Sequence, residues 1–278
     1  SLAACAIFAV APASHVAAQA NTSAGPWVKG FNSSVRLIAG SLPPGDASGK
    51  PKLLAGVEMR LADGWKTYWR HPGDDGGLPP SFGWSGSKNL RNAVVRYPAP
   101  HRIKGLVGTS LGYTTSVIFP VEIETDNVSK PVELALDFEF GICREICVPA
   151  EAKLKLVIPP TLAVMPPELA ASYQKVPQPA PNAGAILKSA KAILTGATPA
   201  ITLDLAAGAA GGKLDLFAEV VEGAFLPVAQ KSGEPAQGIQ RFRIDLKGVE
   251  EAPQLSGKTL RLTIMGQGAA SEVTWAIK

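Results

Sequence analysis

Two cysteines that stand four positions apart are the residues of this sequence best suited to chemistry. Cys143 and Cys147 lie in the segment GICREICVPAE, residues 141–151. In an extended strand their Cα atoms would be ~13 Å apart, beyond the ~7 Å that a disulfide can bridge. The chain must therefore turn between them for a bond to form. Either a helical turn, at ~6 Å, or a hairpin with residues 144–146 at its tip, at ~4.5–5.5 Å, would bring them together.

A disulfide between Cys143 and Cys147 would contribute little as a staple. In the chain-entropy model a loop of five residues stabilises the fold by about 2 kcal/mol, against almost 5 kcal/mol for a loop of about a hundred residues. We therefore interpret the two cysteines as a redox-active pair that undergoes disulfide exchange with other thiols. A local structural disulfide and two unpaired thiols are the alternatives.

The first twenty residues indicate the compartment. Residues 3–13 form an apolar, alanine-rich run, and the small-x-small sequence AQA at 18–20 follows it, so residues 1–20 resemble a partial signal peptide. Cys5 is expected to be removed with it, although LAAC at 2–5 also resembles a lipoprotein box. Export would place the mature chain in an oxidising space, expected to be the bacterial periplasm, where disulfides persist.

The composition fits a packed protein and argues against two classes of partner. The chain has 278 residues, of which 46% are hydrophobic, enough for one large or two ordinary domains. Basic and aromatic residues alternate over 65–70, but the formal charge of only +4 and the expected export argue against nucleic-acid binding. No later apolar run is long enough to span a membrane, so no transmembrane segment is expected in the mature chain.

Short runs of alternating apolar and polar residues dominate the chain and predict an all-β fold. Before a proline-rich stretch the runs are 53–61, 117–123, 132–140 and 152–158, and after it they are 213–220, 241–247, 259–264 and 273–277. Prolines recur from 159 to 181 and remove backbone donors, which marks a boundary. We therefore expect two β-sandwich domains, residues 21–160 and 186–278. A Pro/Ala-rich linker, 161–185, would join them, with one helical turn near 167–173.

Three stretches resemble one protein family. The cysteine segment with VPAE at 148–151 is similar to the active-site region of the periplasmic N-terminal domain of DsbD-type thiol:disulfide interchange proteins, and more closely to the ScsB-like branch. DGWKTYWR at 63–70 resembles the family's Asp-Gly-aromatic strand, and the stretch from Tyr113 through FPVEI at 119–123 resembles the strand after its cap loop. The resemblance covers residues 27–160. It implies an immunoglobulin-like sandwich for the first domain, in a soluble form without the family's membrane portion.

The activity implied by the resemblance is that of a thiol:disulfide oxidoreductase acting as an electron relay. Such a protein receives electrons from a membrane-embedded thiol donor. It passes them to periplasmic thioredoxin-like or other disulfide-bearing proteins.

The same resemblance implies roles for individual residues. Cys147 matches the cysteine that forms mixed disulfides with partners, and Cys143 matches the one that resolves them. Tyr68 aligns with an aromatic residue beside the pair, and the cap loop falls near 104–112. There Leu106 and Val107 stand where the family places bulky aromatic cover. Two residues of the segment after the cysteines complete the expected site, namely Pro149 and Glu151.

Metal chemistry is the main alternative to exchange. The loop HPGDDGG at 71–77 combines an imidazole with two carboxylates, but its proline and glycines explain a turn fully. Cys143 and Cys147 could hold Cu(I) with a histidine or methionine, because soft thiolates select that ion. The alternative function is therefore a non-catalytic two-domain binding or copper-handling module with a structural disulfide or Cu(I)-binding cysteines. Under the exchange hypothesis the sequence predicts no cofactor and no metal.

Overall fold

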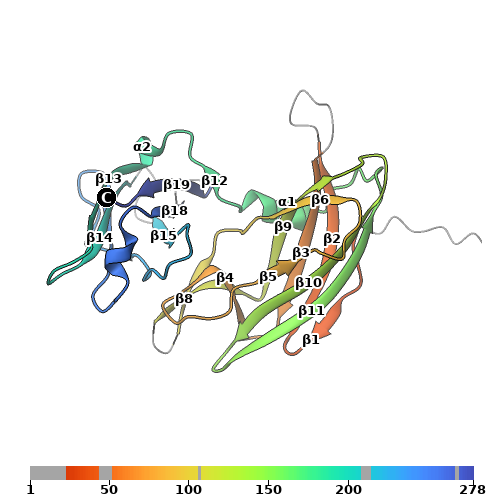
Figure 1. The fold of residues 1–278 in the computed structure, drawn as a ribbon, viewed down its shortest axis with the longest axis horizontal. Helices are drawn as coiled ribbons and strands as arrows, with labels where there is room; N and C mark the ends of the chain where they lie inside the picture. The colour runs from red at the N-terminus through yellow and green to blue at the C-terminus, as the bar shows by residue number, and fades with distance from the viewer. Residues whose placement is uncertain (1–22, 44–51, 106–107, 208–213, 267–268) are drawn as a thin grey trace, which may run out of the picture.

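The chain folds into two lobes of β-sheet with a short helix between them (Figure 1). The computed structural model describes residues 23–43, 52–105, 108–207, 214–266 and 269–278. The expected signal peptide, residues 1–20, lies outside these ranges. Within them, no helix is long and apolar enough to cross a membrane.

The first eleven strands form two facing sheets. Their bounds are β1 Val28–Gly30, β2 Ser33–Leu42, β3 Lys52–Leu61, β4 Lys66–Gly73, β5 Ser81–Gly83, β6 Leu90–Val95, β7 His101–Lys104, β8 Thr109–Thr114, β9 Ser116–Thr125, β10 Val132–Cys143 and β11 Cys147–Ile158. One sheet has the order β1-β2-β3-β9-β6, and the other has the order β11-β10-β4-β8-β7, with β5 paired to β10. Strand β10 therefore lies between β11 and β4, which places Cys143 directly beside β4.

The burial of β10 shows why this segment forms a strand. Val132, Leu134, Leu136, Phe138 and Phe140 are all buried, whereas the polar residues between them mostly face outward. Alternate side chains of a strand point to opposite faces, so one face of β10 closes the core. Phe138 and Phe140 stack there with ring centroids 4.7 Å apart. The expected strands in this half of the chain and the all-β, immunoglobulin-like class are confirmed.

The second lobe is also a pair of sheets. Its elements are β12 Gln178–Pro179, α2 Ala183–Ile186, β13 Leu187–Ile193, β14 Ala200–Ala206, β15 Asp215–Val220, β16 Gln230–Lys231, β17 Ile239–Asp245, a 3-10 helix Ala252–Leu255, β18 Thr259–Met265 and β19 Ser271–Ala276. The sheets have the orders β12-β19-β18-β15 and β13-β14-β17-β16. Their inner faces share one apolar core that includes Leu203, Phe242 and Leu262. The strands expected after the proline-rich stretch are confirmed here.

The helix α1, Pro167–Gln174, lies inside the segment that we expected to be a linker and packs on the first sandwich. Leu169 is fully buried against Ile38 and Leu54. A Cβ atom on Gly56 would lie 2.9 Å from a methyl carbon of Leu169, so the glycine makes room for it. Tyr173 also donates to Glu122 at 2.8 Å. We therefore propose that the first folding unit extends through α1. The expected ends of the two domains, residue 160 for the first and residue 186 for the second, stay predictions.

Replacing Leu169 tests whether α1 belongs to the first sandwich. Leu169→Ala should lower the free energy of unfolding by about 2–5 kcal/mol, because it empties a closed apolar site. Urea denaturation followed by tryptophan fluorescence measures this. The matched control Val164→Ala truncates an exposed side chain just before the helix and should change stability by less than about 0.5 kcal/mol. Equal losses for the two variants would contradict the packing of α1.

Candidate functional site

The two cysteines close the end of a long hairpin and form a disulfide. Strands β10 and β11 pair without interruption over twelve positions, from Val132 opposite Ile158 to Cys143 opposite Cys147. The Cα atoms of the cysteines are 4.1 Å apart. At the tip, the backbone N–H of Arg144 donates to the carbonyl oxygen of Ile146 at 3.2 Å. Of the two geometries that the spacing allowed, the hairpin is therefore the correct one.

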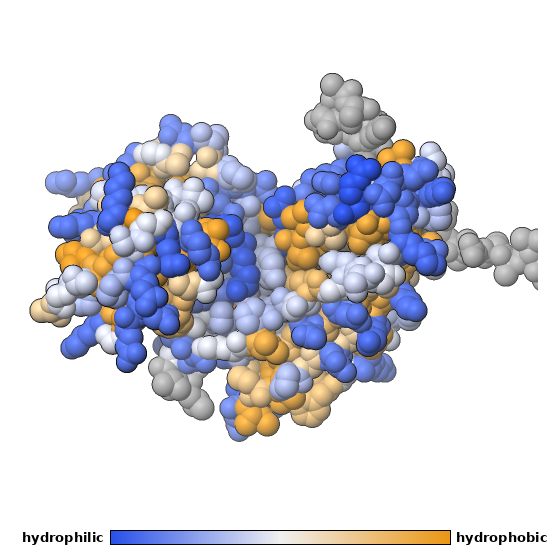
Figure 2. Space-filling model, viewed as in Figure 1, coloured by the Kyte–Doolittle hydropathy of each residue, from blue (hydrophilic) through white to orange (hydrophobic). Residues whose placement is uncertain are grey.

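The two sulfur-bearing residues differ in their access to solvent. Cys143 is 5% exposed, because β4 covers it, whereas Cys147 is exposed. Ile146, the residue before Cys147, is 67% exposed. Phe31 is 58% exposed, and the centre of its ring lies 5.3 Å from that of Trp65, which lines a pocket together with Cys143. Figure 2 shows apolar surface gathered around the tip of this hairpin, at the bottom of the view. A macromolecule that approaches the tip thus meets Cys147 before Cys143.

Tyr68 of β4 lies beside the pair, where we expected it. Its hydroxyl is 3.0 Å from the Sγ of Cys147. Because a disulfide sulfur carries no hydrogen, the hydroxyl is the donor. Burial, and to a smaller extent the carboxylate of Asp75, raises the pKa of Tyr68, so the hydroxyl stays protonated near neutral pH. Tyr68 can therefore donate a hydrogen bond to Cys147 in the disulfide and, after reduction, to its thiolate.

Strand β4 is held against the cysteine strand by pairing and by a side chain. Thr67 lies opposite Ile142, and its hydroxyl donates to the carbonyl of Gly141 at 2.8 Å. Lys66 lies opposite Cys143. The β4 part of the DGWKTYWR stretch thus forms a wall of the site. The stretch opens with an Asp-Gly turn, in which Gly64 has a φ of +79°, a conformation that a glycine adopts without strain.

A buried polar network beside Cys143 was missed in the sequence. The Nζ of Lys66 donates to the Oγ of Ser110 at 2.7 Å, and that hydroxyl donates to Asp75 at 3.2 Å. A pocket of about 300 Å³ lies over it and is lined in part by Lys66, Lys104, Arg144 and Cys143. The sequence singled out Asp75 only as one carboxylate of the HPGDDGG loop, a possible metal site. Its link to Lys66 joins residues of two different elements, which no local spacing predicts.

The other expected site residues lie farther from the sulfurs or outside the described ranges. Pro149 faces Gly141 in the hairpin, and Glu151 faces Glu139. Both Pro149 and Glu151 are exposed, and no hydrogen bond joins either to the cysteines. Leu106 and Val107, the expected cap residues, lie outside the described residues.

The histidine of the HPGDDGG loop already has protein partners on both ring nitrogens. The Nδ1 of His71 accepts from the backbone N–H of Gly73 at 3.2 Å, so the Nε2 donates to the carbonyl of Leu226 at 2.8 Å. Burial lowers the pKa of His71, which keeps the ring neutral at pH 7. Among the described residues, no group of three or more His, Cys, Asp and Glu side chains is placed to hold a metal ion.

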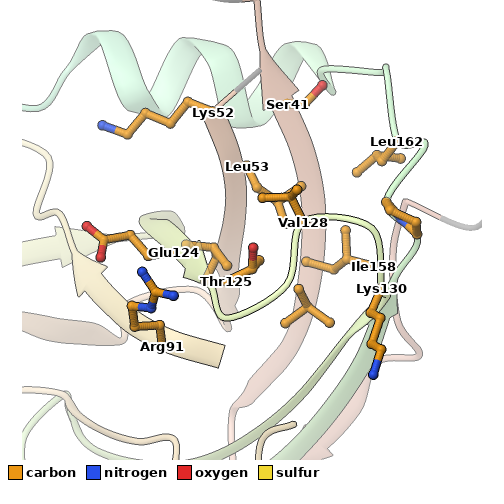
Figure 3. Close-up of a pocket in the computed structure, with 13 residues that line it drawn as sticks. Ser41, Lys52, Leu53, Arg91, Glu124, Thr125, Val128, Lys130, Ile158 and Leu162 are labelled. Carbon is orange, nitrogen blue, oxygen red and sulfur yellow. The ribbon is translucent and has the colours of Figure 1, made fainter. Parts of the chain in front are cut away.

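A larger pocket, of about 520 Å³, lies at the opposite end of the hairpin, around Val132 and Ile158 (Figure 3). Apolar side chains form much of its wall, while Lys52, Arg91 and Glu124 lie at its side. It contains no cysteine or histidine. Eleven register positions separate it from the disulfide, or ~35 Å along a strand. It is therefore not part of the cysteine site.

Comparison with known proteins places the hairpin and its disulfide in a defined class. Residues 41–159 match the family model for thiol:disulfide interchange protein DsbD, N-terminal. This part of the chain is therefore a DsbD-type N-terminal domain. The match spans β3 to β11 and includes both cysteines and Tyr68. No curated protein matches the chain.

Among solved structures, the chain resembles the N-terminal periplasmic domain of ScsB from Proteus mirabilis, with a TM-score of 0.69 and 19% sequence identity. This alignment covers 92% of the present chain and 98% of that one, so the two-lobed fold as a whole is shared. The reduced DsbD N-terminal domain of Neisseria meningitidis is 15% identical over 43% of this chain and 83% of its own. Its TM-score of 0.24 supports no further statement.

Removing the tyrosine hydroxyl should slow the chemistry of reduced Cys147. In Tyr68→Phe the thiolate loses a hydrogen bond worth about 1–1.5 kcal/mol, so the midpoint of its pH–rate profile for alkylation by iodoacetamide should rise by about one unit. Mass spectrometry of the tryptic peptide 145–153 follows Cys147 alone. Tyr97→Phe, which removes another partly buried hydroxyl, is the control and should leave the profile unchanged. An unshifted midpoint in Tyr68→Phe would show that the 3.0 Å contact does not act on the thiolate.

Proposed function

We propose that the protein is a periplasmic thiol:disulfide interchange protein, a protein-disulfide reductase that relays electrons through Cys143 and Cys147. One observation carries the proposal. Cys147, an exposed residue, is bonded to the buried Cys143 and accepts a hydrogen bond from Tyr68 inside a DsbD-type domain. The signal-like residues 1–20 and the likeness to a periplasmic domain of ScsB support the location.

The oxidised pair first accepts two electrons from a dithiol donor. A donor thiolate attacks the exposed Sγ of Cys147, a new S–S bond forms, and the bond to Cys143 breaks with its sulfur leaving as a thiolate. The second donor thiolate then attacks the donor sulfur of this mixed disulfide and releases Cys147 as a thiolate. The donor ends as a disulfide, and Cys143 and Cys147 end as a dithiol after taking up two protons. We propose a membrane-embedded thiol protein as this donor.

The reduced pair then passes the electrons on. The thiolate of Cys147 attacks a disulfide of the acceptor, forms a mixed disulfide and expels one acceptor thiolate. Cys143 attacks the Sγ of Cys147, which restores the internal disulfide and releases the second acceptor thiolate. In the oxidised protein the hairpin register places Cys143 opposite Cys147, so the resolving thiol lies beside the mixed disulfide on Cys147.

The surface around Cys147 favours a protein as the partner. Ile146 is an exposed large apolar side chain at the tip, and the exposed Phe31 packs on Trp65, which lines the pocket beside Cys143. Exposed apolar patches mark interaction sites. We therefore propose periplasmic thioredoxin-like or other disulfide-bearing proteins as acceptors. Pro149 and Glu151, exposed along β11, would lie at the side of such a contact, and Leu106 and Val107 remain the proposed cap residues.

The order of attack can be tested by trapping. Cys143→Ser should accumulate a mixed disulfide through Cys147 when the reduced protein meets a disulfide-bearing thioredoxin-like protein, because the resolving thiol is missing. Cys147→Ser should not, because Cys143 is buried. Non-reducing gels and mass spectrometry score the adduct. Equal trapping by both variants would contradict the assigned roles.

The reduction potential separates exchange from a structural bond. We expect a value between about −270 and −180 mV, the range from thioredoxin to protein disulfide isomerase. Equilibration with glutathione or dithiothreitol buffers measures it. A value below about −300 mV would mark an inert disulfide and would refute the relay while leaving the fold untouched.

A further inference from the structure

The two sandwiches meet at the strand that carries Tyr68. Two residues after Tyr68, Arg70 donates through Nε to Glu219 at 2.6 Å and through Nη2 to Glu272 at 2.5 Å, both in the second sandwich. Its guanidinium also lies 4.4 Å from the centre of the Trp69 ring. These charges are largely withdrawn from water, so separating them would leave buried charge uncompensated. The contact therefore fixes how the second sandwich docks on β4.

A second anchor lies on β7. Arg102 forms a two-pronged contact with Asp215, at 2.9 and 3.0 Å, and also donates to the carbonyl oxygens of Leu216 and Ala229. Paired bonds between a guanidinium and a carboxylate fix orientation as well as distance. With two anchors on different strands, the docked sandwich has a defined rotation relative to the cysteine site.

The second sandwich also contacts the segment of residues 74–78, which follows β4 and which we call the covering loop. The backbone N–H of Val228, in the second sandwich, donates to the Oδ1 of Asp74 at 2.7 Å. On its other side, the backbone N–H of Asp74 donates to the carbonyl of Thr109 at 2.9 Å. Asp74 is thus clamped between the second sandwich and β8, and the covering loop starts from this fixed point.

The covering loop in turn confines the ring of Tyr68. A Cβ atom on Gly77 would lie 2.3 Å from the Cζ of Tyr68, and one on Gly141 would lie 3.2 Å from its Cε2. The backbone N–H of Gly141 donates to the carbonyl of Leu78 at 3.0 Å, which ties the loop to β10. The phenol ring therefore sits in a slot between loop and strand, and the slot directs its hydroxyl at Cys147.

We propose that the second sandwich is a positioning element for the redox pair, and that Asp74 is the positioning residue that links docking to the contact between Tyr68 and Cys147. This inference rests on the proposed function in taking Cys147 as the attacking sulfur. It assigns to the second sandwich, which has no cysteine or histidine of its own, the task of keeping the hydrogen-bond donor of the site in place.

The sign of the effect separates positioning from simple electrostatics. Removing the negative charge of Asp74 would, through space alone, favour the thiolate of Cys147 and move its pH–rate midpoint to lower pH. Releasing the covering loop removes the Tyr68 donor and moves the midpoint to higher pH. The other charged groups near this contact, Lys66, Asp75, Arg144 and Glu145, are the same in every variant below.

The test is a double-mutant cycle on the full chain, read by alkylation of reduced Cys147 against pH. Asp74→Ala should slow alkylation at pH 7 by about three- to tenfold and raise the midpoint. Asp74→Asn keeps an oxygen acceptor for Val228 but loses the negative charge, so its midpoint should lie at or slightly below that of the parent. In a Tyr68→Phe background, Asp74→Ala should not raise the midpoint further, because both changes remove the same hydrogen bond.

Leu169→Ala, a destabilised variant far from the site, controls for general loosening and should leave the midpoint unchanged. If Asp74→Ala does not fold, Val228→Pro removes the same bond from the donor side and should give the same shift. The inference is overturned if Asp74→Ala lowers the midpoint or leaves it unchanged. It is also overturned if Asp74→Ala raises the midpoint equally in the parent and in the Tyr68→Phe background. The assay needs no partner, so failed trapping by Cys143→Ser would refute the proposed function without affecting this result.

Discussion

The unbroken register between β10 and β11 is the constraint on which the rest of the site depends. Side chains of paired strands alternate between faces, so a slip by one residue would move each apolar residue of β10 from core to solvent. The core residues Leu134, Leu136 and Phe138 therefore fix the register. Once they do, Cys143 and Cys147 must lie opposite each other at the far end. The chemistry of the tip is set by packing in the middle of the sheet.

The same register explains the difference between the two sulfurs. Cys143 is the last residue of a central strand and pairs with β4 as well as β11, so it is covered. Cys147 opens a strand at the edge of its sheet and is not. The outer side of an edge strand has no neighbouring strand, so its backbone N–H and C=O groups are open to other chains. The asymmetry that a relay needs, one accessible and one protected thiol, thus follows from strand order.

Much of the fold could be predicted from the sequence, because half-buried strands leave a local trace. The alternation of 53–61 and 132–140 identified β3 and β10. The cysteine spacing predicted a turn. Whether that turn is a hairpin or a helical turn depends on the strands on either side, which the spacing alone does not reveal. What the sequence did not reveal are contacts between distant residues. Arg70 finds Glu219 and Glu272, and Leu169 finds Ile38, through tertiary packing that leaves no periodic pattern.

The length of the β10–β11 ladder has a consequence for the lifetime of the protein in the cell. Breaking the S–S bond opens a loop of only five residues, while the other register pairs and the core beneath them continue to hold the two strands together. Reduction should therefore cost only the ~2 kcal/mol of the short loop, which raises the fraction of unfolded chain by up to about 30-fold while the fold itself persists. Cellular proteases act mainly on unfolded chains. The abundance of the protein should consequently fall, by a few-fold, when the reduced form accumulates.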